Sequence, residues 1–213
     1  MKFTGLKIFK LFEIIIVFAG FPLLYYFDYI PFHKAIPLLT VFAIMLVLLL
    51  TNKNFDRRFL GFNGFNDWKP IILRFLIIST FIIVLVWIFS PDSLFLLPRE
   101  RPGLCFLIMI FYPIWSVYPQ ELIYRSWFFH RYNDLIRNET HLIILNAVFF
   151  SFSHIIFRNL LVIVLTFAGG LMFAYTYRRS NSLMVVFVEH MLYGNLIFTA
   201  GLGQDFYLPM SGG

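Results

Sequence analysis

The stretch from Tyr118 to Tyr132, YPQELIYRSWFFHRY, places charged side chains within an apolar run. That run, at residues 103–125, is long enough to cross a bilayer core about 30 Å thick as a helix. Glu121 and Arg125 are four positions apart, so on a helix they face the same way and can form an ion pair. An ionisable residue at membrane depth costs about 2.5 to 3.5 kcal/mol on insertion scales. The stretch therefore indicates a polar site inside a membrane helix.

The composition of the whole chain is that of a membrane protein. Of its 213 residues, 60% are hydrophobic and 13% are charged, whereas soluble domains average about 45 to 50% apolar and about 25% charged residues. Six further apolar runs are long enough, or nearly so, to span a bilayer, at residues 11–30, 35–51, 70–90, 141–157, 160–177 and 182–200. We expect an all-α polytopic integral membrane protein, with seven to eight transmembrane helices around a polar intramembrane cavity. No repeat or linker divides the sequence, so residues 1–213 are expected to form one transmembrane domain.

The distribution of basic residues predicts the orientation of the spans, because Lys and Arg are retained on the cytoplasmic side. With seven spans, the N-terminus and the loops near residues 51–69, 131–139 and 178–179 share one side and hold eleven Lys and Arg residues, against four on the other side. This favours a multi-pass protein of the cell membrane with a cytoplasmic N-terminus. The basic residues are spread over short loops, so the net charge of +6 does not indicate nucleic acid as a partner. Glu13 interrupts the first run, which we expect to be a retained helix rather than a cleaved signal.

Several polar residues remain inside the other spans. Besides those of the opening stretch, they are Glu13, Arg74, His154, Glu189, His190 and Asn195. His154 and His190 lie on two different spans, and Glu121 lies on a third. Neutral imidazoles and a carboxylate are suitable zinc ligands. Bound zinc lowers the pKa of a water molecule to about 7, and a neighbouring carboxylate can take the proton. These three residues therefore predict a hydrolytic metal site.

The same residues also have structural interpretations. A buried His is more often a packed core residue than a ligand, and Glu121 with Arg125 would also hold two helices together. On a helix Glu189 points about 100° away from the adjacent His190, so we expect it to pair with Arg74 or another helix, or to orient a His. A small transporter that uses the span charges as its pathway is a third class, but the chain lacks an inverted repeat.

The motifs of common soluble hydrolases and nucleotide-binding proteins are absent. The chain contains no HExxH, no GxSxG, no Walker loop and no GxGxxG. Its single cysteine, Cys105, allows neither a disulfide framework nor a zinc site built from cysteines. A metal site would therefore need His, carboxylate or amide ligands.

Three blocks of sequence, taken in order, resemble the CPBP family of intramembrane metalloproteases, also called the ABI family, which is related to the CAAX prenyl endopeptidases. The blocks run from Gln120 to Arg125, from Phe150 to His154 and from His190 to Asn195. They are similar to the family's Glu-Glu-x-x-x-Arg, Phe-x-x-x-His and His-x-x-x-Asn-like motifs, and the resemblance covers about residues 100–205. It implies zinc as a cofactor bound by His154 and His190. It also implies catalytic roles for Glu121, Arg125 and Asn195, with Arg125 orienting the acidic group and Asn195 steadying the oxyanion.

The sequence departs from the family motifs at two positions. Gln120 replaces the first Glu, and an amide cannot act as a base. Asn195 stands one position late, because Gly194 occupies the fourth place after His190. In one interpretation Glu121 takes over as the base while Gln120 positions substrate or water. In the other, chemistry is lost.

These interpretations lead to two predicted functions. The first is an intramembrane metalloendopeptidase that cleaves a membrane-associated peptide or protein with metal-activated water and a Glu base. The second is a catalytically inactive relative that acts as a membrane scaffold or an immunity-type protein. In both, the partners are the lipid bilayer and a membrane-associated peptide or protein.

Overall fold

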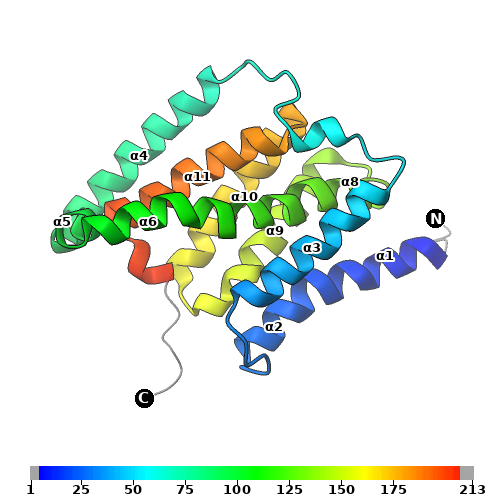
Figure 1. Ribbon diagram of the computed structural model, residues 1–213, viewed down its shortest axis with the longest axis horizontal. Helices are drawn as coiled ribbons and strands as arrows, with labels where there is room; N and C mark the ends of the chain where they lie inside the picture. Colours follow the sequence, from blue (N-terminus) through cyan, green and yellow to red (C-terminus); the bar gives the residue numbers. More distant parts are fainter. Residues whose placement is uncertain (1–4, 207–213) are drawn as a thin grey trace.

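The computed structural model describes residues 5–206 as a bundle of helices, with no strand in that range (Figure 1). Six helical stretches are long and apolar enough to cross a membrane: Gly5–Tyr26, Lys69–Phe89, Pro102–Tyr132, Glu139–Phe157, Leu160–Ser180 and Leu183–Ala200. A seventh apolar helix, α3 (Ala35–Thr51), has 17 residues. These seven segments coincide with the seven predicted runs, which confirms an all-α multi-pass membrane protein.

The C-terminal half of the chain forms the centre of the bundle. In Figure 1, α9 (Glu139–Phe152), α10 (Leu160–Ser180) and α11 (Leu183–Ala200) lie between α4 (Lys69–Phe89) on one side and the N-terminal helices on the other. In the most apolar part of each span, 44% of the residues of α11 are buried inside the protein, but only 17% of those of α4. The central helices therefore carry the protein core, and the outer helices face lipid.

The N-terminal segment is one helical run that packs on the central helices. It consists of α1 (Gly5–Ile15), the π-helical turn η1 (Ile16–Gly20) and α2 (Phe21–Tyr26). Phe18 in η1 is almost completely buried and meets the rings of several aromatic residues edge-on, among them Tyr124 at a centroid distance of 5.3 Å. Large apolar side chains on the other face of this segment are exposed, as expected for contact with lipid.

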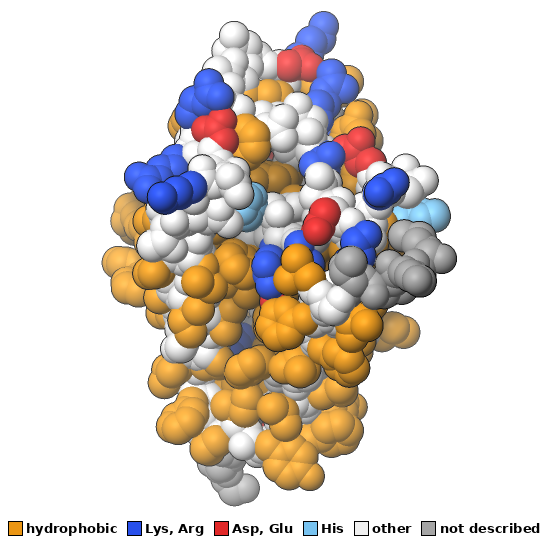
Figure 2. Space-filling view, turned by 90° about the vertical axis from the view of Figure 1, so that its right-hand side faces the viewer, with side chains coloured by type: hydrophobic (Ala, Val, Ile, Leu, Met, Phe, Trp, Pro, Cys, Tyr) orange, Lys and Arg blue, Asp and Glu red, His pale blue; other side chains and the backbone are white. Residues whose placement is uncertain are grey.

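Charged side chains gather at one end of the molecule. Figure 2 faces the end where α1 begins, and Lys and Arg side chains cluster over part of it while hydrophobic side chains cover the rest. Glu13 lies near this end and pairs with Arg131 at 2.7 Å. Lys10 pairs with Asp134 at 2.6 Å. Glu13 is thus part of a helix-end ion pair. The location of this end in the cytoplasm stays a prediction.

The span that contains the opening stretch is continuous but irregular. Between α6 (Pro102–Tyr112) and α8 (Phe128–Tyr132) it passes through two π-helical turns, η4 (Pro113–Val117) and η5 (Leu122–Trp127), on either side of the short α7 (Tyr118–Glu121). A proline lacks the backbone N–H of a regular helix, and π-helical turns accommodate such a defect and are frequent at functional sites. The span therefore passes Pro119 as a locally widened helix and does not end there.

Candidate functional site

Glu121 lies completely buried between a histidine and an arginine. Its Oε1 is 2.7 Å from Nδ1 of His190 on α11, and its Oε2 is 3.1 Å from Nε of Arg125 one turn along its own span. Glu121 and Arg125 both have 0% exposed side chains. The second contact is held by charge rather than by an aligned hydrogen bond, since neither of its two atoms has a hydrogen-bond partner within residues 5–206. The ion pair predicted from the spacing is confirmed.

A buried amide that sequence reasoning missed completes this cluster. Asn146 on α9 accepts a hydrogen bond from Arg125 and donates one to the carbonyl oxygen of Tyr124 at 2.5 Å. The guanidinium of Arg125 also lies over the ring of Phe150, 4.9 Å from its centroid. The available signal was a polar amide inside an apolar span, one turn before Phe150. Asn146 ties α9 to the span that carries Glu121.

The two histidines are each fixed through one ring nitrogen. Nδ1 of His154, in the 3-10 turn η6 (Ser153–Phe157), lies 2.7 Å from the carbonyl oxygen of Phe150. Because a carbonyl only accepts hydrogen bonds, this Nδ1 is the donor and Nε2 is the acceptor in the neutral ring. By the same reasoning His190 donates through Nδ1 to the carboxylate of Glu121. Both Nε2 atoms are therefore available to water, substrate or a metal.

The rings of these histidines lie on two sides of Phe150. The centroid of the Phe150 ring is 4.9 Å from that of His154 and 5.7 Å from that of His190. Phe173 on α10 stacks on His190 at 4.5 Å. The structure thus brings His154, His190 and Glu121 into one neighbourhood, with aromatic rings that restrict the orientation of both imidazoles.

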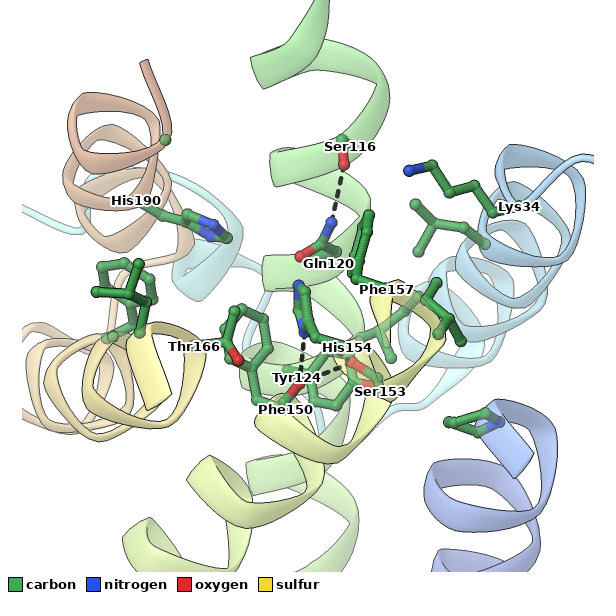
Figure 3. A pocket seen from close by; sticks show the side chains of 18 of the residues that line it. Lys34, Ser116, Gln120, Tyr124, Phe150, Ser153, His154, Phe157, Thr166 and His190 are labelled. Carbon is green, nitrogen blue, oxygen red and sulfur yellow. Dashed lines mark hydrogen bonds between the residues drawn. The ribbon is translucent and has the colours of Figure 1, made fainter. Parts of the chain in front are cut away.

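A cavity of about 540 Å³ opens beside these residues. Its wall is mainly apolar, and its polar part includes Gln120, Ser116, His154 and His190. Figure 3 places Gln120 between the two histidines. The Gln120 amide donates from Nε2 to Ser116 Oγ at 2.8 Å, and its buried Oε1 has no hydrogen-bond partner in the described part of the chain.

Other predicted site residues lie away from this wall. Within residues 5–206, Glu121, Arg125 and Asn195 are not among the residues that line the cavity. Glu121 and Arg125 lie behind His190. The amide of Asn195 is directed to the carbonyl oxygen of Met109 on α6, at 3.4 Å. Gln120, rather than Glu121, is thus the residue of the acidic motif that faces the cavity.

Glu189 is separate from the cluster. Its Oε1 accepts hydrogen bonds from Arg74 on α4, with Nε of Arg74 at 3.1 Å, and Arg74 also donates to Thr176 on α10 at 2.9 Å. The expected pairing of Glu189 with Arg74 is confirmed. This contact joins α4 to the central helices.

The side chains around the cavity offer fewer ligands than a catalytic zinc ion usually has. Catalytic zinc sites usually have three protein ligands and one open position. His154 and His190 offer two Nε2 atoms, whereas the Glu121 carboxylate is engaged by His190 and Arg125. Among the described residues, no group of three or more His, Cys, Asp or Glu side chains is placed to hold a metal ion. The residues present fall short of a usual catalytic zinc site, and zinc binding stays a prediction.

Comparison with known proteins gives one match. Residues 102–196 match the family model described as type II CAAX prenyl endopeptidase Rce1-like. The matched range contains all three sequence blocks. It confirms that the sequence resembles proteases of the CAAX prenyl endopeptidase type. No curated protein matches the chain. No solved structure matches it either.

Proposed function

We propose that this protein is an intramembrane endopeptidase that hydrolyses a peptide bond in a membrane-associated peptide or protein. The observation that carries the proposal is the hydrogen bond of 2.7 Å between Glu121 and Nδ1 of His190, since His190 also lines the cavity. A carboxylate in this position fixes the tautomer of the imidazole and stabilises its protonated form. His190 then has the properties of a general base.

In the proposed reaction the nucleophile is a water molecule held by Gln120, His154 and His190. Nε2 of His190 takes one proton of the water as its oxygen attacks the scissile carbonyl carbon, and Glu121 stabilises the imidazolium that forms. Nε2 of His154 and Oε1 of Gln120 accept hydrogen bonds from the water or from the substrate N–H. When the tetrahedral intermediate collapses, the C–N bond breaks and His190 returns the proton to the leaving amine.

In this scheme Glu121 acts through His190, which is how a buried carboxylate can contribute when position 120 carries an amide. Arg125 holds Glu121 in place, because its guanidinium Nε lies 3.1 Å from Oε2 of the carboxylate and both side chains are completely buried. Zinc, where it binds, would be held by His154 and His190 and would polarise the scissile carbonyl. The proton transfers above use only residues of the chain.

The test is cleavage of membrane-anchored peptides by protein reconstituted in liposomes, with products identified by mass spectrometry. We expect His154→Ala, His190→Ala and Glu121→Gln each to lower turnover by at least about 10²-fold, the lower range for loss of an acid–base group. His141→Ala, at an exposed position of α9, is the matched control and should keep wild-type turnover. The proposal fails if none of the three variants lowers the observed activity. Bound zinc is measured on the same preparations.

A second function is favoured by one observation, namely that an amide faces the cavity while the Glu121 carboxyl group is buried and engaged. In that case the protein is a non-catalytic relative that binds a membrane-associated peptide. Gln120→Glu separates the two functions, because it restores a carboxylate at the wall. Cleavage by Gln120→Glu but not by the wild type would identify the wild type as the inactive form. Peptide binding would then survive His154→Ala and His190→Ala.

A further inference from the structure

A tyrosine ring occupies the space beside Gly194, one turn after His190 on α11. A Cβ atom built on Gly194 would lie 2.6 Å from Oη and 2.8 Å from Cζ of Tyr112, closer than real Cβ atoms approach other atoms. No side chain fits at position 194 while Tyr112 keeps this place. The ring of Tyr112 thus fills the position that a residue 194 side chain would have.

This position is next to the proposed base. Residues four apart on a helix are neighbours on one face, with Cβ atoms about 5 to 6 Å apart. Because Oη of Tyr112 lies 2.6 Å from the Cβ position of residue 194, it is about one helical turn from the point where His190 is attached. Tyr112 and His190 both line the cavity. Tyr112 therefore belongs to the wall where the reaction is proposed to occur, and its hydroxyl lies against Gly194, one turn after the proposed base.

The Tyr112 ring is held by its neighbours. It meets the ring of Phe198, also on α11, at a centroid distance of 5.1 Å and an angle of 69°. Tyr112 is the last residue of α6, immediately before the π-helical turn that begins at Pro113. An aromatic ring fixed in this way loses little further freedom when its hydroxyl forms a hydrogen bond.

The proposed reaction needs a hydrogen-bond donor for the oxygen that becomes negative, and the two nearby amides each already direct one N–H to another partner. Nε2 of Gln120 donates to Ser116. Nδ2 of Asn195 is directed to the carbonyl of Met109. A phenol is a good alternative, because its O–H donates a hydrogen bond and stays protonated near neutral pH. A preorganised donor of this kind can lower the barrier by about 2.7 to 4 kcal/mol.

We propose that the hydroxyl of Tyr112 is the oxyanion donor of this site, in place of an amide one turn after His190. The inference rests on the proposed peptidase function and adds a residue to it. The absence of a side chain at Gly194 is then part of the site, because it admits the tyrosine.

The test compares turnover of the wild type with that of Tyr112→Phe, which keeps the ring and its packing but removes the hydroxyl. We expect kcat to fall about 10²- to 10³-fold, with KM changed less than about threefold, because the donor acts on the transition state. Tyr118→Phe is the matched control, since Tyr118 lies in the same span but not in the cavity wall, and it should keep the wild-type kcat. If Asn195 were the donor instead, Asn195→Ala would cost more than Tyr112→Phe.

A rescue variant gives an independent check. Tyr112→Ala combined with Gly194→Asn removes the ring and supplies an amide one turn after His190. We expect this double variant to be at least tenfold more active than Tyr112→Ala alone. No gain would count against a donor at this place, provided that the double variant unfolds at the same temperature as Tyr112→Ala.

A binding measurement separates this inference from the peptidase proposal. A phosphinate peptide carries a tetrahedral oxyanion, and its Kd is compared with that of the corresponding amide peptide for wild type and Tyr112→Phe. If wild-type turnover is found and Tyr112→Phe does not reduce it beyond threefold, the Tyr112 assignment is overturned and the peptidase stands. If the wild type cleaves nothing, the peptidase proposal is overturned. The Kd of the phosphinate peptide then decides whether the Tyr112 hydroxyl binds an oxyanion. Weaker phosphinate binding by Tyr112→Phe supports the assignment, and equal binding by both proteins overturns it.

Discussion

Glu121→Gln is expected to lower both the stability and the activity of the protein, for two different reasons. The carboxylate Oε2 lies 3.1 Å from Nε of Arg125, and both side chains have 0% exposure. At that distance and an effective dielectric constant of about 20, the Coulomb energy of the pair is about 5 kcal/mol. Removal of one partner leaves the other charge buried without compensation, which typically costs about 3 to 5 kcal/mol. We expect a loss of stability of that size.

The activity should fall because His190 loses its orienting carboxylate. An amide at position 121 can present its N–H to Nδ1 of His190 and so favour the wrong tautomer. In serine proteases the corresponding change lowers kcat by about 10⁴-fold. We expect turnover by Glu121→Gln to fall about 10³- to 10⁴-fold on the same reasoning.

A double variant distinguishes these two effects. Replacing Arg125 by Met as well removes the charge that Glu121→Gln leaves unpaired, so stability should recover by at least half of the loss, while the activity stays low. Unfolding is followed by Trp fluorescence in detergent, and turnover is followed with the membrane-anchored peptide. Glu13→Gln is the matched control, because it breaks a partly exposed ion pair with Arg131, and such pairs contribute only about 0 to 1 kcal/mol.

Two outcomes would refute this reasoning. If Glu121→Gln unfolds within about 1 kcal/mol of the wild type, then the buried pair does not have the energy assigned to it. If activity returns together with stability in the double variant, then Glu121 is only a structural partner of Arg125, and His190 does not depend on it.

Further predictions concern the amide behind the site and the loop at the charged end. Asn146→Leu removes the acceptor for Arg125 and the donor to the carbonyl of Tyr124, so unfolding in detergent should show a loss of about 1 to 3 kcal/mol; an unchanged transition would contradict the described contacts. Hydrogen bonding to Lys10 lowers the pKa of Asp134 below the ordinary value of an aspartate. The stabilisation by this pair is therefore present at pH values above that ordinary pKa and is lost as the pH falls through the folded-state pKa. Asp134→Asn should remove this acid dependence, which is less than about 1 kcal/mol for a pair whose carboxylate is exposed, and pH-dependent unfolding of both proteins checks it.

Local sequence patterns were sufficient to predict the helices and several contacts. The apolar runs predicted seven spans because hydrophobic length is itself what a membrane helix requires. The Glu121–Arg125 pair followed from a spacing of four along one helix. The pairing of Glu189 with Arg74 was one of the alternatives that its direction on the helix, about 100° away from His190, left open, and the structure shows this one.

The contacts that were missed depend on how helices pack against one another. Asn146 was one of several polar residues in a span, and only its packing against Arg125 gives it a role. In the sequence Gly194 is only the residue that stands at the fourth place after His190, whereas the structure shows it as a contact surface for Tyr112. Residues 112 and 194 are far apart in sequence, and no periodicity connects them. At Pro119 the helix continues, because π-helical turns on either side of the short α7 accommodate the proline.

The two departures from the family motif have one physical consequence in common. Gln120 puts a neutral amide where the motif has a carboxylate, and Gly194 admits the neutral phenol of Tyr112, so two imidazoles, an amide and a phenol contribute to the polar wall. The charged pair of Glu121 and Arg125 lies behind it, where each charge compensates the other. No carboxylate is among the described residues that line the cavity, and such a wall is less costly to maintain at membrane depth than one with an unpaired carboxylate. A hydrolytic reaction on such a wall has to obtain its base from an imidazole that a buried carboxylate supports, which is the arrangement of His190 and Glu121.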